Sequence, residues 1–147
     1  MKAVLDVGQY VSATIQARGH PAQIGRAWRA GRFELVTSTA ILDDLRRVLR
    51  YPHLRKRRHW TDEEIELFVD SIALAATLTP GDLEVNAIAA TEGSPTDNKV
   101  VACALEGQAD YGIASDDHLL KLERYGRTVI LPPRRFLTLI EEIQSTG

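Results

Sequence analysis

The amino-acid sequence predicts an α/β fold, a three-layer α/β/α sandwich with a central, mainly parallel sheet of four or five strands. Short apolar runs alternate along the chain with longer segments whose apolar residues recur at helical spacing. In the stretch 94–120, a helix, a strand and a second helix follow one another closely. Strands that alternate with helices form parallel sheets covered on both faces. The length of 147 residues fits one domain, residues 1–147.

The first half of the chain carries the start signals of three helices: a proline in a first turn, a Ser-Thr cap and a capping box at 61–64. The apolar stripes after these signals predict helices over 21–31, 40–50 and 61–76. Apolar runs predict strands over 3–5 and 33–37. Residues 7–9 are expected to leave the first strand, and the basic stretch 54–60 is expected to be a connection after the helix-breaking Pro52.

The second half continues the alternation. A strand is expected within 75–79, and 80–93 is typical of a loop. The next helix carries Val100 and Val101 inward and ends at Gly107. A strand over 111–114 then leads into a helix that opens at Ser115. The last strand is expected over 127–131, and a terminal helix begins at Pro133.

The composition is that of an ordinary soluble protein, with 44% hydrophobic and 26% charged residues. A net charge of -2 gives no global attraction to nucleic acid, so such binding would need a local basic patch. Cys103 is the only cysteine, which excludes an internal disulfide, and we expect it to be an inert core residue. The chain has no secretory signal and no apolar run of membrane-spanning length, so we expect a cytoplasmic protein without membrane contact.

Four aspartates stand where the predicted fold brings acids to one edge of the sheet. Asp6 and Asp116 follow the ends of predicted strands, whereas Asp44 and Asp97 lie on or beside the inward faces of helices. Buried carboxylates repel one another unless a cation neutralises them. Mg²⁺ and Mn²⁺ prefer oxygen ligands, so we predict a site for one of these ions. The alternative for each aspartate alone is a helix cap or a partner of the helix dipole.

Four segments, in order along the chain, together resemble the PIN-domain nucleases. They are Val-Leu-Asp6, Ile-Leu-Asp-Asp44-Leu-Arg-Arg-Val-Leu-Arg-Tyr-Pro, Pro-Thr-Asp97-Asn-Lys and Ala-Asp-Tyr-Gly-Ile-Ala-Ser-Asp116. The set is most similar to the toxin components of bacterial and archaeal toxin–antitoxin pairs, such as VapC. The resemblance covers almost the whole chain and implies a PIN-like domain over residues 1–147.

The resemblance also implies an activity. It implies a Mg²⁺- or Mn²⁺-dependent endoribonuclease that hydrolyses RNA phosphodiester bonds, usually a homodimer, silenced by a cognate antitoxin protein whose tail enters the active site. Carried over position by position, the implied catalytic residues are Asp6, Asp44, Asp97 and Asp116. The implied metal ligands are Asp6, Asp97 and Asp116.

The sequence departs from the family pattern around these acids. Val7 and Gly8 replace polar residues that brace the site, Asp44 replaces the more frequent Glu, and Ser94 and His118 stand where aspartates are common. Loss of such support weakens metal affinity or activity by roughly 10- to 100-fold. An alternative function is therefore a degenerate PIN domain that binds RNA or an antitoxin with little or no turnover.

Two further alternatives concern single features. His118 is either a substitute ligand or general base, or an exposed residue in the first turn of its helix, and the second interpretation is the more common one. A phospho-acceptor switch of the receiver type also places aspartates at strand ends. It needs a paired acid after the first strand, which Asp6-Val7-Gly8 does not supply.

The basic residues are concentrated in one region, where they predict an RNA-binding surface. Clustered cations contact phosphates with an affinity that falls as salt rises. The candidate RNA-binding residues are Arg46, Arg47, Arg50, Arg55, Lys56, Arg57 and Arg58. The alternative is a solvated helix face with ordinary ion pairs.

Overall fold

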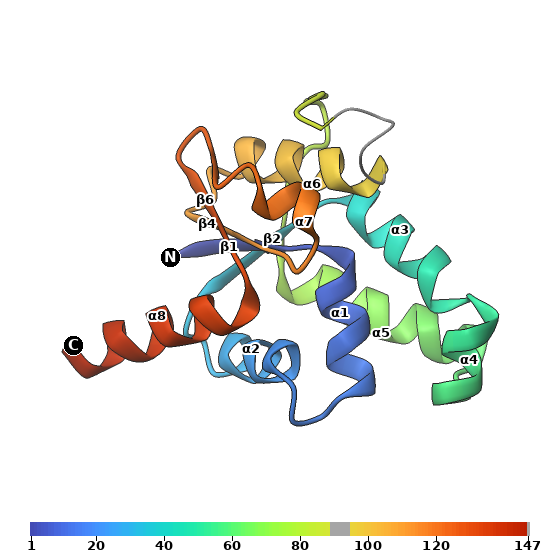
Figure 1. Ribbon diagram of the computed structural model, residues 1–147. Helices are drawn as coiled ribbons and strands as arrows, with labels where there is room; N and C mark the ends of the chain where they lie inside the picture. Colours follow the sequence, from blue (N-terminus) through green and yellow to red (C-terminus); the bar gives the residue numbers. More distant parts are fainter. Residues whose placement is uncertain (89–94, 147) are drawn as a thin grey trace.

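A sheet of six strands crosses the molecule in a computed structural model, which describes residues 1–88 and 95–146. Its strand order is β3-β2-β1-β4-β6-β5, and every neighbouring pair is parallel except β5 and β6. Figure 1 shows β1 between β2 and β4. The strands are β1 (Lys2–Leu5), β2 (Glu34–Thr37), β3 (Thr77–Leu78), β4 (Tyr111–Ile113), β5 (Arg124–Tyr125) and β6 (Thr128–Leu131).

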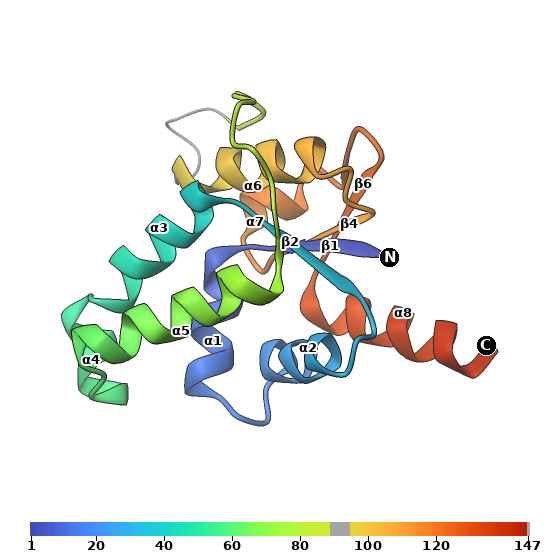
Figure 2. The ribbon, with the colours of Figure 1, turned by 180° about the vertical axis from the view of Figure 1, so that it is seen from behind.

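Helices cover both faces of this sheet. The two opposite views in Figures 1 and 2 place α6 and α7 over one face and α1, α2, α5 and α8 against the other. The helix α3 contacts α1 and α5 as well as α6. This arrangement confirms the predicted three-layer sandwich. The helices are α1 (Val7–Ile15), α2 (His20–Arg29), α3 (Thr39–Leu49), α4 (Pro52–Arg58), α5 (Asp62–Ala75), α6 (Pro95–Glu106), α7 (Asp117–Leu120) and α8 (Pro133–Thr146).

Two predicted helix starts are present as hydrogen-bonded caps. The Ile41 N–H donates to Ser38 Oγ over 3.2 Å at the start of α3. At the start of α5, the Glu64 N–H donates to Thr61 Oγ1 and the Thr61 N–H donates to Glu64 Oε1. These bonds satisfy donors that a helix start leaves without a partner inside the helix. The capping residues therefore fix where both helices begin.

The helix α1 corrects the prediction that residues 7–9 simply leave the first strand. Asp6 caps this helix, and the chain turns from β1 into α1 with no loop between them. Val7, Tyr10 and Thr14 are buried at helical spacing. The pattern was missed because Gly8 and the polar Gln9 interrupt its start.

The helix α4 corrects the predicted connection over 54–60. Pro52 occupies the first turn, where its missing N–H removes no helical hydrogen bond. Only Leu54 in this helix is buried, so the segment has almost no apolar stripe to signal it. His59 ends the helix in a left-handed conformation with φ 54°.

The edges of the sheet also differ from the prediction in one respect. The two-residue strand β3 lies within the expected 75–79, whereas β5 was not predicted. Arg124 and Tyr125 pair antiparallel with β6 across the turn at Gly126, which has φ 60°. A strand of two residues is too short to show the alternation by which strands are predicted.

The core lies between the sheet and its helices. Val4, Val36 and Ile113 of the central strands are completely buried, and the rings of Phe33 and Phe136 meet edge to face at 5.1 Å. Cys103 is also buried, and burial raises the pKa of its thiol to about 11, as expected for an inert core residue. Within residues 1–88 and 95–146, no helix has the length and apolarity needed to cross a membrane.

Candidate metal centre

Asp6 lies at the carboxyl end of the central strand. Its N–H donates to the Ile113 carbonyl of β4 over 3.0 Å, so its backbone is held by the sheet. Its Oδ1 accepts the Val7 N–H over 2.8 Å, which caps α1. Only one oxygen of the carboxylate is used in this cap. The sheet and the helix together fix the direction of the Asp6 side chain.

Asp116 occupies the equivalent place after the neighbouring strand β4. Its Oδ1 accepts the His118 N–H over 2.6 Å and caps α7, and the His118 Nδ1 lies 3.2 Å from the same oxygen. Because β1 and β4 are parallel and adjacent, residues that follow them meet at one edge of the sheet. The structure therefore places Asp6 and Asp116 on the same edge, as predicted.

Asp97 reaches this edge from α6, which packs over the sheet. It lies in the first turn of α6 and is 2% exposed. One oxygen each of Asp97 and Asp116 and one ring nitrogen of His118 all lie within 4.8 Å of one another. Sequence reasoning left His118 either as a substitute ligand or general base or as an exposed first-turn residue, and in the structure its half-exposed ring lies beside Asp116.

The acids at this edge are electrostatically coupled. Burial and the negative charge of Asp97, with a smaller contribution from Asp116, raise the pKa of Asp6 to about 6, although the Val7 N–H opposes the shift. Burial and nearby carboxylates both make the ionised form of Asp6 less favourable. A divalent cation bound between these oxygens would favour the ionised form.

Asp44 has different partners from the other three acids. Its Oδ2 accepts from Lys99 Nζ over 2.9 Å and from Thr96 Oγ1 over 2.8 Å, and its Oδ1 pairs with Arg47 at 3.2 Å. Burial alone would raise the pKa of Asp44, but the hydrogen bonds from Lys99, Thr96 and Arg47 outweigh burial and lower this pKa. Thr96 and Lys99 flank Asp97 on α6, so Asp44 fastens α3 to the helix that carries Asp97.

Sequence reasoning missed the residues that brace the edge. Gln9 is 3% exposed, and its Nε2 donates to Ser115 Oγ over 3.0 Å. This bond joins the first turn of α1 to the loop that carries Asp116, and it supplies support where Val7 and Gly8 offer no polar side chain. Gln9 follows Asp6 by three residues, and this spacing was the signal that could have indicated the role of Gln9. Ser94 lies outside the described residues.

The donor set fits a hydrated divalent cation. Its carboxylate oxygens suit Mg²⁺ and Mn²⁺, and an imidazole nitrogen of His118 lies beside them. In addition, Gln9 Oε1 is buried and has no hydrogen-bond donor among the described residues. A buried acceptor of this kind has room for a hydrogen bond from an ordered water. Asp6, Asp97 and Asp116 are thus suitable first ligands.

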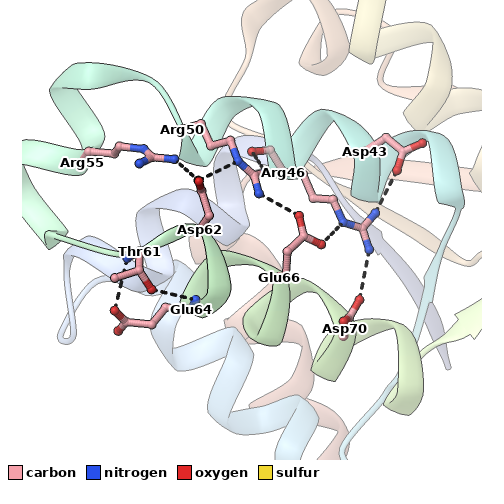
Figure 3. A network of polar contacts seen from close by, with 9 residues as sticks. All are labelled: Asp43, Arg46, Arg50, Arg55, Thr61, Asp62, Glu64, Glu66 and Asp70. Atoms are coloured by element: carbon pink, nitrogen blue, oxygen red, sulfur yellow. Dashed lines mark hydrogen bonds and ion pairs between the residues drawn. The ribbon is translucent and has the colours of Figure 1, made fainter.

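Most of the predicted RNA-binding arginines are engaged within the chain. Figure 3 shows Arg46 of α3 bound to Asp43, Glu66 and Asp70, and Arg50 bound to Asp62 and Glu66. Arg55 of α4 also pairs with Asp62. We call these seven residues the α3–α5 ladder.

The other basic residues are placed differently. Arg47 binds Asp44 and donates to the Tyr51 hydroxyl over 2.6 Å. Lys56, Arg57 and Arg58 are exposed, and the Arg58 guanidinium lies 5.6 Å from the centre of the Trp60 ring. Ion pairing thus describes Arg46, Arg50 and Arg55, whereas RNA contact remains a prediction for the exposed cations of α4.

The structure thus combines an α/β sheet with carboxylates gathered at the carboxyl edge of its parallel strands. A sequence model of the PIN domain matches residues 2–118, from β1 to the second residue of α7. The chain therefore belongs to the PIN-domain family, whose members are generally nucleases. The match includes all four aspartates and His118. No curated protein matches the chain.

Proposed function

We propose that this protein is a Mg²⁺- or Mn²⁺-dependent endoribonuclease that hydrolyses RNA phosphodiester bonds as the toxin of a toxin–antitoxin pair. The observation that carries the proposal is that ligand oxygens of Asp97 and Asp116 lie within 4.8 Å of each other, while burial and the charges of both acids raise the pKa of Asp6 to about 6. Membership of the PIN-domain family supports the same activity.

The roles of the residues follow from their contacts. Asp6, Asp97 and Asp116 would hold the metal, which when bound activates a water and offsets charge on the phosphate. Asp6 and Asp116 each give one oxygen to a helix cap, which aims the other. Asp44 is the fourth catalytic acid of the proposal. Through its bonds to Thr96 and Lys99 it holds the first turn of α6, and with it Asp97.

The proposed partners are RNA, a cognate antitoxin protein and a second copy of the chain in a homodimer, in the cytoplasm. Lys56, Arg57 and Arg58 are the exposed cations that would contact RNA phosphates. Support for the antitoxin and the homodimer comes from the resemblance to VapC-like toxins. An antitoxin would silence the enzyme by covering the edge with the four acids.

The test combines metal titration by calorimetry with RNA cleavage on the same samples. We expect the native chain to bind Mn²⁺ or Mg²⁺ and to cut RNA, and Asp97→Asn to lose both. Asp82→Asn is the matched control, because Asp82 is exposed on a loop outside the site. A native protein that binds no metal at millimolar concentration and cuts nothing would overturn the nuclease.

One observation favours the degenerate binding module as a second candidate. Val7 is buried and Gly8 is exposed, so neither of the two residues after Asp6 offers it a polar side chain. A Cβ at Gly8 would lie 3.7 Å from Asp6 Oδ2, which is an ordinary contact, so a side chain fits there. A large gain in RNA cleavage by the double variant Val7→Thr, Gly8→Asn would support the degenerate module.

A further inference from the structure

His118 is held in a fixed relation to the acids. Its backbone N–H is bonded to Asp116 Oδ1, and the next residue, Leu119, is 1% exposed and anchors α7 in the core. The backbone that carries the His118 side chain is therefore fixed beside Asp116. In the structure the ring lies with its Nδ1 3.2 Å from Asp116 Oδ1 and is not directed away into solvent.

The distances suit ligands of one ion. Two ligands on opposite sides of an octahedral Mg²⁺ lie about 4.2 Å apart, since each is about 2.1 Å from the ion. The ligand atoms of Asp97, Asp116 and His118 are all within 4.8 Å of one another. A small movement of side chains would bring all three into one coordination sphere.

We propose that His118 is an imidazole ligand of the metal at Asp97 and Asp116 and that it makes the site selective for Mn²⁺ over Mg²⁺. This inference rests on the proposed function and names its cofactor. Mg²⁺ favours oxygen ligands almost exclusively, whereas first-row transition ions gain affinity when imidazole replaces an oxygen. The histidine thus changes the preferred metal without removing the site.

Pulsed electron paramagnetic resonance of the Mn²⁺-loaded protein gives a direct readout, because a bound imidazole couples its ¹⁴N nucleus to the Mn²⁺ electrons. We expect this coupling in the native protein and in His53→Gln, in which an exposed histidine of α4 is replaced. We expect His118→Asp to bind Mn²⁺ without the coupling. Circular dichroism of each variant checks that it is folded.

Calorimetry of the same proteins measures the selectivity. We expect His118→Asp to lower the ratio of Mn²⁺ affinity to Mg²⁺ affinity by about tenfold, the size typical of a changed metal environment. We expect His53→Gln to leave the ratio unchanged. These titrations need no substrate, so they report on the ligand set and not on turnover.

Two outcomes separate this inference from the proposed function. In the first, Mn²⁺ binds the native protein without ¹⁴N coupling, and Asp97→Asn abolishes this binding. This result would overturn the role of His118 but would leave the metal-dependent nuclease standing. Absence of any Mn²⁺ or Mg²⁺ binding would overturn both. An unchanged affinity ratio in His118→Asp would also overturn the selectivity.

Discussion

The α3–α5 ladder and the edge with Asp6, Asp97 and Asp116 use acids in opposite ways. In the ladder, hydrogen bonds from Arg50 and, second, from Arg46 lower the pKa of Glu66. At the edge, burial and neighbouring carboxylates raise the pKa of Asp6 to about 6. Every acid of the ladder pairs with at least one arginine of the chain. The raised pKa of Asp6 is typical of a site that would take an external cation, whereas the acids of the ladder already pair with arginines of the chain.

The largest expected effect comes from metal at the edge. A ligand at 100 times its dissociation constant stabilises the folded state by about 2.7 kcal/mol. We expect saturating Mn²⁺ to raise the melting temperature by about 5–10 °C, and chelation to reverse the change. Thermal unfolding followed by circular dichroism measures it. The rise in melting temperature should disappear in Asp116→Asn and persist in Glu66→Gln. If the rise persists in Asp116→Asn, the metal does not bind at the edge, and the contrast with the ladder is wrong.

A second effect separates paired from unpaired cations. We expect the triple variant Lys56→Ala, Arg57→Ala, Arg58→Ala to weaken RNA binding and to reduce the slope of log affinity against log salt by about 2, since each single-strand phosphate contact contributes about 0.7. Fluorescence anisotropy with a labelled RNA at several salt concentrations measures both. Arg46→Met serves as the control, because Arg46 is already bound to acids. Equal losses in both proteins would contradict this assignment.

A third effect is a pH dependence of the metal-free protein. The pKa of Asp6 rises from 3.8 to about 6 on folding, so protonation of Asp6 favours the folded state. That stabilisation is complete below pH 3.8 and is lost as the pH rises through about 6. From pH 7.5 to pH 5 we expect a gain of about 1 kcal/mol in the free energy of unfolding. Urea unfolding with a chelator measures it.

The matched variant for this pH dependence is Asp6→Asn. An asparagine retains the helix cap but cannot be ionised. The difference in pH dependence between the native protein and this variant isolates Asp6 from the four histidines, which titrate in the same range. If the free energy of unfolding depends on pH in the same way in both proteins, folding does not raise the pKa of Asp6.

The smallest effect is expected in the ladder. Exposed ion pairs contribute about 0–1 kcal/mol, and salt screens them. We expect Arg46→Met to lower the free energy of unfolding by less than about 1 kcal/mol, because the methionine still covers the apolar surface under the arginine stem. Urea unfolding at low and high salt measures the loss, which should shrink at high salt. A loss of several kcal/mol would mean that the ladder contributes much more to the stability of the fold than exposed ion pairs do.

The sequence predicted the layers and the positions of Asp6 and Asp116, because both depend on apolar periodicity and on strand ends. The contacts of Asp44 could not be predicted in the same way. Its partners Thr96 and Lys99 lie more than fifty residues further along the chain, on a helix whose packing against α3 depends on the whole sheet.

The missed elements have a local cause. The helix α1 begins directly after β1, so its Asp6 cap was taken only as the end of the strand, and α4 has a proline in its first turn but no apolar stripe. The brace between Gln9 and Ser115 joins segments 106 residues apart. Such a bond becomes visible only when β1 and β4 are known to be neighbours.

The double use of Asp6 and Asp116 has a consequence for how this protein can change over evolutionary time. Each carboxylate is a helix cap as well as a proposed ligand. Glutamate would reach a metal but is a poor cap, and serine would cap the helix but lose the charge. A descendant that had lost all cleavage would still favour aspartate, asparagine or serine at these positions. The presence of aspartate at these two positions therefore reflects helix capping as well as the proposed catalysis.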